Sequence, residues 1–193
     1  MGKTNDYHFI THWRVRATRD EVFEILDDAR DLAVWWPSVY LGVTEVHPGN
    51  KDGLGKVVRL YTKGWLPYTL HWSFSIVRVD YPDGFSLAAT GDFVGRGIWT
   101  FEQDGDYVNI TYDWKLAAEK PLLKYFSFIM KPIFSANHHW AMRMGEESLK
   151  LELLRHRAKT PAELASIPPP PPSTFQRWVE TEKSRSGVGH SSL

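Results

Sequence analysis

The feature that most constrains this chain is a series of six segments between residues 43 and 116 in which apolar and polar residues alternate. Alternation with a period of two is typical of a β-strand that buries one face. The segments are separated by short runs rich in Pro, Gly, Asn and Asp, which favour tight turns between antiparallel neighbours. The sequence therefore predicts consecutive antiparallel strands at residues 43–47, 56–62, 68–80, 85–91, 97–102 and 107–116.

One further strand and two short helices are expected before this series. Residues 7–16 alternate in the same way. Thr18 followed by Glu21 has the spacing of a capping box, which predicts the start of a short helix. A second short helical or turn-like piece should occupy residues 28–39 and end near Pro37, because proline disfavours helix in the residue before it.

A long helical segment is expected after the strands, at residues 121–155, where apolar residues recur at helical spacing. A curved sheet with one apolar face must be covered by another element. The sequence therefore predicts an α+β fold, in which a curved seven-stranded antiparallel sheet wraps around a long C-terminal helix. The two short helices would follow the first strand.

The chain divides into one expected domain and two flanking segments. Residues 1–6 are polar and should form a flexible N-terminus, and residues 7–157 should form the domain. Beyond them the composition changes, with five consecutive prolines at residues 168–172 and a final segment rich in Ser and Gly. We expect residues 158–193 to form a disordered, Pro-rich tail outside the fold.

Composition excludes several classes of function. The chain has 193 residues and no cysteine, which excludes disulfide frameworks, thiolate metal sites and cysteine nucleophiles. Its 23 basic and 23 acidic side chains balance, so an electrostatic surface for nucleic acid is not expected. The longest apolar-rich run, residues 122–134, contains Lys124, Lys131 and Pro132, which argues against stable membrane insertion. A cytoplasmic location is expected.

The order of elements, together with four short segments, resembles the START-like or SRPBCC superfamily, which includes polyketide cyclases/dehydrases and lipid-transport proteins. The segments are Thr18–Phe23, Trp35–Pro37, Gly91–Phe101 and Asn137–Met142, and the resemblance covers residues 7–155. It implies a helix-grip fold with a deep hydrophobic cavity between the sheet and the long helix. The superfamily places binders, carriers, cyclases and oxygenase subunits on one scaffold, so the resemblance leaves the activity open.

The candidate ligand-binding residues are the apolar and aromatic residues that alternate on the strands or lie on the apolar stripe of the helix. Aromatic residues make up 14% of the chain, which suits either a core or a cavity wall. The candidates are Trp72, Phe74, Leu87, Trp99, Phe101, Tyr112, Trp114, Ile133, Asn137, Trp140 and Met144.

Three polar residues, Tyr112, Asn137 and Arg59, are candidates for catalysis, with Tyr61 and Tyr68 as further polar candidates for the cavity. Asn137 lies on the apolar stripe of the helix, and burying its amide without partners would cost about 1–3 kcal/mol. It must therefore bind either a ligand or another part of the chain, and the second is favoured. A tyrosine or arginine in an apolar cavity could polarise a carbonyl group, although the pattern places no base on the same face.

His138 and His139 invite a metal interpretation, which the helical geometry disfavours. Consecutive helical residues point about 100° apart, and metal ligands on one helix normally lie four residues apart. We therefore expect no metal, and a histidine packed at the boundary between helix and sheet is favoured. The sequence implies no cofactor.

Three functional hypotheses remain. The leading one is a binding protein for a small hydrophobic ligand, whether aromatic, polyketide-like or lipid. The first alternative is a cyclase or dehydratase that acts on such a ligand in the same cavity. The second is lipid transfer at a membrane surface, suggested by the apolar and basic residues at 122–126. The sequence leaves open whether the chain forms a homodimer.

Overall fold

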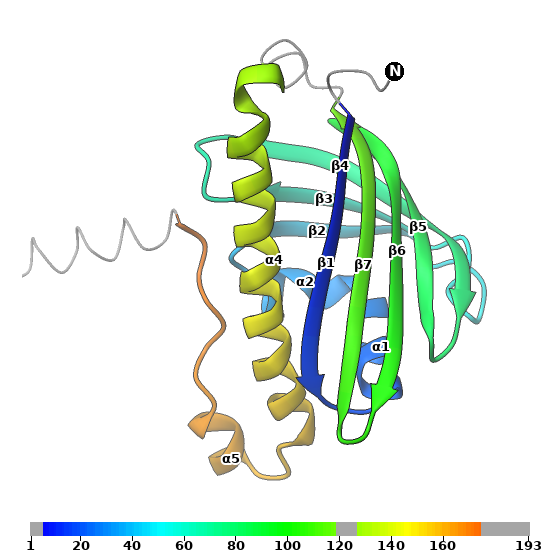
Figure 1. Ribbon diagram of the computed structural model, residues 1–193. Coiled ribbons are helices and arrows are strands. Elements are labelled where there is room, and N and C mark those ends of the chain that lie inside the picture. The colour runs from blue at the N-terminus through cyan, green and yellow to red at the C-terminus, as the bar shows by residue number, and fades with distance from the viewer. Residues whose placement is uncertain (1–5, 119–126, 175–193) are drawn as a thin grey trace, which may run out of the picture.

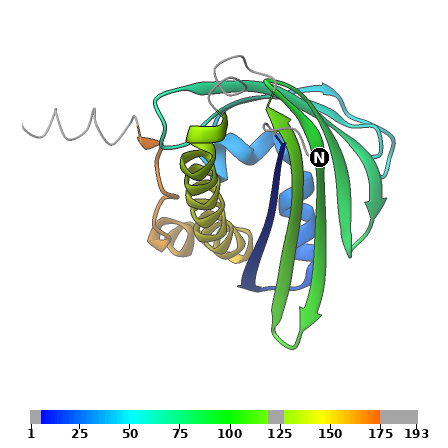
Figure 2. The same cartoon turned by 45° about the horizontal axis from the view of Figure 1, so that its top comes forward.

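The computed structural model describes residues 6–118 and 127–174, and it confirms the predicted fold class. A seven-stranded antiparallel sheet curves around one long helix, α4 (Figure 1; Figure 2). The elements are β1 (Asp6–Arg16), α1 (Arg19–Asp27), the 3-10 helix η1 (Ala29–Asp31), α2 (Leu32–Trp35), β2 (Tyr40–His47), β3 (Val57–Lys63), β4 (Thr69–Asp80), β5 (Gly84–Gly91), β6 (Phe93–Asp104), β7 (Tyr107–Ala118), α4 (Ser127–Arg157) and α5 (Pro161–Ser166).

Strands β2 to β7 form an antiparallel meander, and β1 pairs with β7 at one edge of it. The sheet order is β1-β7-β6-β5-β4-β3-β2, so strands β2 to β7 pair with their neighbours in sequence. The β1–β7 pairing sets Phe9 opposite Trp114 and Trp13 opposite Ile110. Since each pair lies on the same face of the sheet, the apolar residues of both strands are turned toward α4 and the short helices.

The capping box predicted at the start of α1 is present. The Glu21 backbone N–H donates to the Thr18 hydroxyl at 3.3 Å, and the Thr18 backbone N–H donates to the Glu21 carboxylate at 2.8 Å. The same carboxylate accepts two hydrogen bonds from Arg157, at 2.7 and 2.8 Å, at the end of α4. This contact ties the last turn of α4 to the first turn of α1.

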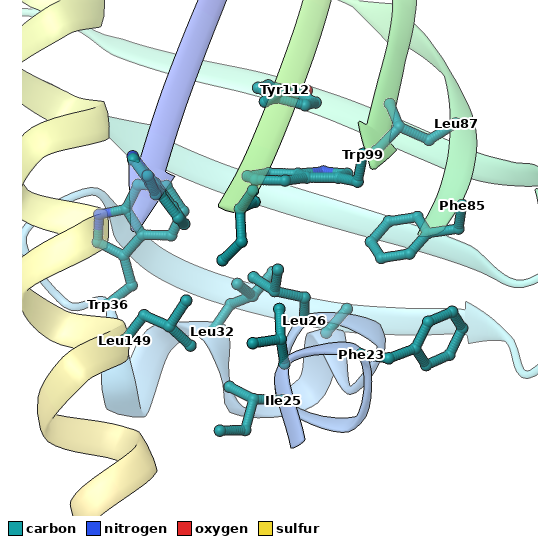
Figure 3. Close-up of a cluster of buried hydrophobic side chains, with 14 of the residues drawn as sticks. Phe23, Ile25, Leu26, Leu32, Trp36, Phe85, Leu87, Trp99, Tyr112 and Leu149 are labelled. Atoms are coloured by element: carbon teal, nitrogen blue, oxygen red, sulfur yellow. The ribbon is translucent and has the colours of Figure 1, made fainter. Parts of the chain in front are cut away.

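The hydrophobic core fills the end of the sheet that α1 and α2 cover (Figure 3). Val22, Trp35 and Leu149 are almost completely buried there. At Gly145 the helix approaches Trp36 so closely that a Cβ atom would overlap the indole ring. A residue without a side chain is therefore needed at this point of α4.

The segment after α4, residues 158–174, follows the protein surface. Thr160 caps α5 by accepting from the Glu163 backbone N–H at 3.2 Å, and Pro161 begins the helix. The prolines at 169–172 then lie beside Leu151 and Leu154 of α4. Leu151 is partly buried there, whereas Leu154 stays 50% exposed. The rest of the expected tail, and most of the expected N-terminal segment, lie outside the described residues.

Candidate ligand cavity

A cavity of about 180 Å³ lies between the sheet and the N-terminal half of α4. Its wall is mostly apolar and aromatic and is formed by β1, β2, β3, the loop between β3 and β4, β4, β6, β7, α4 and the segment around Trp36. The core shown in Figure 3 closes the end of the cavity nearest to α1 and α2. The helix-grip arrangement thus fills one end of the sheet and leaves space at the other.

Four of the candidate ligand-binding residues line this cavity: Trp72, Tyr112, Trp114 and Asn137. The other strand candidates, Phe74, Leu87, Trp99 and Phe101, do not line it and are buried in the core. They lie on the expected face of the sheet but nearer to α1, where other side chains fill the space. Arg59 is exposed on β3 and does not line the cavity, because its neighbours Val58 and Leu60 take the buried face.

The helix candidates other than Asn137 lie outside the cavity wall, because α4 turns a different face toward the sheet. Ile133, Trp140 and Met144 are only partly buried and do not line the cavity. The face that meets the sheet carries Phe134, His138, Ala141 and Met142, and it continues with Gly145, Ser148 and Leu149. Several of these residues are small or polar. A search for hydrophobic residues at helical spacing therefore selected a neighbouring face of α4.

Sequence reasoning also missed several aromatic residues of the wall. Tyr7 and Phe9 reach the cavity from β1, Tyr40 from β2 and Phe93 from β6. Phe9 shares the buried face of β1 with Trp13, so extending that alternation back by two residues would have found Tyr7. No comparable signal marked Phe93, because the strand it begins was expected to start at residue 97.

The side-chain oxygen of Asn137 is satisfied by the chain itself. Its side-chain oxygen accepts from the backbone N–H groups of Trp65 and Leu66, at 2.9 and 3.4 Å. Both donors belong to the loop between β3 and β4, whose Gly64 also lines the cavity. Asn137 therefore links α4 to this loop by hydrogen bonds.

Tyr112 is held as a neutral phenol deep in the wall. Its ring stacks on Trp99 with centroids 4.0 Å apart and on Trp114 at 5.6 Å. A Cβ atom on Gly97 would lie 2.6 Å from the Tyr112 hydroxyl, so this glycine makes the room that the hydroxyl occupies. Burial raises the pKa of Tyr112 well above its ordinary value, with Tyr40 as a smaller cause. The hydroxyl is thus suited to hydrogen bonding and not to ionisation.

His138 lies at the boundary between helix and sheet. Its ring stacks on Phe9 of β1, with centroids 4.1 Å apart and planes at 17°. Burial lowers the pKa of His138 to about 4, and the neighbouring His139 contributes in the same direction. His138 is therefore uncharged at neutral pH. Across the described residues, no group of three or more His, Asp or Glu side chains is placed to hold a metal ion.

Two tyrosines lie at the end of the cavity where α4 begins. The rings of Tyr7 and Tyr68 both pack edge-on against Phe134, with centroids 6.3 and 6.2 Å away. Burial raises the pKa of Tyr7, and burial together with Tyr7 raises the pKa of Tyr68 to about 12. Both hydroxyls are therefore protonated across the ordinary pH range.

Known structures share this fold. An aromatase/cyclase, Zhui, from Streptomyces sp. R1128 has a TM-score of 0.62 and 17% identity, over 80% of this chain and 97% of its own. Norcoclaurine synthase from Thalictrum flavum has a TM-score of 0.56 and 14% identity, over 79% of this chain and 97% of its own. A START superfamily protein from Mycobacterium smegmatis has a TM-score of 0.56 and 14% identity, over 74% and 98%. No protein-family model and no curated protein matches the sequence.

These similarities show that the chain has a START-like, helix-grip fold, as the sequence segments implied. The identities are low, so they establish the fold and leave the ligand to the residues of the cavity. None of the helices in the described part of the chain is long and apolar enough to cross a membrane.

Proposed function

We propose that this protein binds a small, largely apolar molecule in the cavity between the sheet and α4. The observation that carries the proposal is an aromatic-walled space that the core leaves unfilled. Ligand pockets in proteins are typically concave and mostly apolar, with a few polar groups that fix orientation. The cavity wall fits that description, and its polar members are Tyr7, Tyr40, Thr62, Lys63, Tyr68, Tyr112, Asn137 and His138.

The volume favours a ligand of one aromatic ring. An engineered apolar cavity of about 150 Å³ accommodates benzene, whereas drug-sized ligands occupy about 300–1,000 Å³. At about 180 Å³ the cavity belongs with the first group. A ring that buries about 150 Å² of apolar surface gains about 4 kcal/mol of transfer free energy, and association costs part of this gain, so binding before polar contacts is no tighter than millimolar. The same volume disfavours a whole lipid as cargo.

A pair of variants on α4 tests the binding site. Ala141 lines the cavity, so Ala141→Leu should fill part of it and weaken the binding of toluene at least tenfold. Ala136 is exposed on the same helix, so Ala136→Leu is the matched control and should bind toluene as the wild type does. Binding would be followed by ligand-observed NMR. Equal affinities in all three proteins would place the binding elsewhere and contradict the proposal.

Native mass spectrometry gives an independent test. Protein purified without detergent would be examined intact and then denatured, and any released small molecule identified. A released aromatic compound of one ring supports the proposed site. A released lipid would contradict the size argument.

A second candidate function is catalysis on the bound ring, favoured by the neutral imidazole of His138 and the neutral hydroxyl of Tyr112, two residues that line the cavity. A neutral imidazole can accept a proton and a phenol can donate one, the two roles that a cyclisation or dehydration needs. Turnover of a candidate substrate that is lost in Tyr112→Phe, with binding retained, would support this function over simple binding.

A further inference from the structure

The segment that follows α5 reaches the wall of the ligand cavity. After α5 the chain turns back along the outer side of α4 toward the β3–β4 loop (Figure 1; Figure 2). There the Thr174 hydroxyl donates to the Gly64 carbonyl at 3.4 Å, and Gly64 lines the cavity. A segment far from the sheet in sequence therefore contacts a residue of the cavity wall.

This Pro-rich segment, residues 168–174, is in contact with the domain along its length. Arg155 of α4 donates to the Pro168 carbonyl. The prolines that follow lie beside Leu151 of the same helix. Ser173 is only 3% exposed, so its side chain is covered by neighbouring atoms. The segment is therefore docked on the domain from the end of α4 up to the cavity wall.

The β3–β4 loop is held from two sides. Asn137 of α4 accepts from the Trp65 backbone N–H at 2.9 Å, and Thr174 donates to the Gly64 carbonyl. Gly64 and Tyr68, at the two ends of the loop, both line the cavity. A loop lacks the ladder of hydrogen bonds that holds a central strand, so its position depends strongly on each such contact. The Pro-rich segment is thus one of the elements that position this wall.

We propose that the Pro-rich segment regulates the cavity, because its docking holds the β3–β4 loop in the position that a bound ligand contacts. The proposal rests on the proposed function and adds a means of regulation to the same site. Release of the segment lowers the affinity for ligand, because only the molecules with the loop in place are competent to bind. By thermodynamic linkage, a bound ligand stabilises the docked segment by the same factor.

Three variants of the full chain test the proposal. Ser173→Glu should release the segment, because it places a charged side chain at a covered position. Ser166→Glu is the matched control, since Ser166 is exposed on α5, just before the segment. Thr174→Val keeps the shape of the side chain and removes the donor to Gly64. It decides the question independently if Ser173→Glu proves unstable.

The first measurement is the dissociation constant of toluene, followed by ligand-observed NMR. Ser173→Glu should raise the constant about fivefold, and Thr174→Val should raise it by a smaller factor. Ser166→Glu should bind toluene as the wild type does. Hydrogen exchange at the Trp65 amide should accelerate in the same order, while exchange in the core strands stays slow.

The second measurement tests the reciprocal effect. Saturating toluene should slow hydrogen exchange at the Ser173 amide of the wild type, although Ser173 does not line the cavity. Ala141→Leu, which fills part of the cavity, should show a weaker effect at the same toluene concentration. Exchange at Ser173 that toluene leaves unchanged would overturn the coupling.

The outcomes separate this proposal from the proposed function. If toluene binds the wild type and both segment variants with the same dissociation constant, the cavity binds ligands and the regulation is refuted. The same conclusion follows if exchange at Trp65 accelerates while the affinity does not change. If toluene does not bind the wild type, the proposed function fails, and the regulation that rests on it fails too.

Discussion

The carboxamide of Asn137 lies directly over the Cα atom of Gly64. A Cβ atom at residue 64 would overlap the Asn137 side chain, whose oxygen accepts the Trp65 backbone N–H. Gly64 and Asn137 also both line the cavity. The contact between α4 and the β3–β4 loop thus requires a glycine at residue 64 and uses the side-chain amide of residue 137.

Gly64→Ala should therefore displace Asn137 and destabilise the protein. We expect a loss of about 1–3 kcal/mol in the free energy of unfolding, the usual cost of forcing an extra methyl group into a packed site. Urea denaturation measures it. Gly42→Ala is the control, because a Cβ atom there would make only an ordinary contact, at 3.7 Å from Tyr61 Cβ. Equal losses in both variants would mean that the Asn137 contact is not the cause.

Asn137→Ala should loosen the loop more than it destabilises the whole molecule. It removes the acceptor for the amides of Trp65 and Leu66, and one hydrogen bond contributes about 1 kcal/mol. Hydrogen exchange at those two amides should accelerate, while exchange in the core strands stays slow. Asn137→Asp keeps an acceptor oxygen and should retain most of the protection. Unchanged hydrogen-exchange rates at these two amides in Asn137→Ala would show that Asn137 does not hold the loop to α4.

The architecture follows closely from the sequence because it depends on local rules. Alternation, turn residues and the capping box at Thr18 each predict structure within a few neighbouring residues, and all three are present. The start of β6 at Phe93 was missed, since the glycines at 95 and 97 weaken a strand pattern. The structure explains the glycine at 97, because the Tyr112 hydroxyl from the neighbouring strand occupies the space that a side chain there would need.

The site was less predictable because it depends on contacts between distant elements. On α4, the residues facing the sheet include Ala141, Gly145 and Ser148, which no hydrophobicity scale selects as a contact face. At Gly145 the ring of Trp36 occupies the space that a side chain would need. Along the sheet, Trp72 lines the cavity whereas Phe74, on the same face, does not. That difference depends on what covers each residue, and a strand pattern carries no such information.

His138 should make stability depend on pH between about 6.5 and 4. Its pKa is lowered from 6.5 to about 4 in the folded protein, so within this window the unfolded chain binds more protons and a falling pH favours unfolding. The loss reaches up to about 3 kcal/mol. The neighbouring Tyr7 and Tyr68 stay neutral throughout and add nothing to the change. Urea denaturation from pH 7 to pH 4 should show this loss in the wild type and a smaller one in His138→Phe.

Glu21 should act in a lower pH window. Its pKa is lowered from 4.5 to about 2, first of all by the hydrogen bond from Arg157, so its contribution is present above pH 4.5 and is lost as the pH falls toward 2. Glu21→Gln keeps the capping box, which accepts either residue, and removes the ion pair. A double-mutant cycle with Arg157→Gln should give a coupling of about 1 kcal/mol at pH 7. A coupling near zero would show that the pair does not hold α1 and α4 together.

The Pro-rich segment should stabilise α4 because it covers apolar residues on the side of the helix away from the sheet. The prolines at 169–172 lie beside Leu151 and Leu154, Arg155 donates to the Pro168 carbonyl, and the Thr174 hydroxyl donates to the Gly64 carbonyl at 3.4 Å. Ser173 is only 3% exposed. A chain ending at residue 159 would lose these contacts and expose more of Leu151, which is partly buried, whereas Leu154 is already 50% exposed.

Two truncations isolate this effect. One chain would end at residue 159 and the other at residue 174, so that the difference between them reports residues 160–174 alone. We expect the shorter chain to unfold at a lower temperature, by about 4 °C for each kcal/mol lost in a domain of this size. The exchange of the Trp65 amide should also rise, because Gly64 loses its contact with Thr174. Identical melting curves for the two chains would show instead that the segment rests on the surface without contributing to the fold.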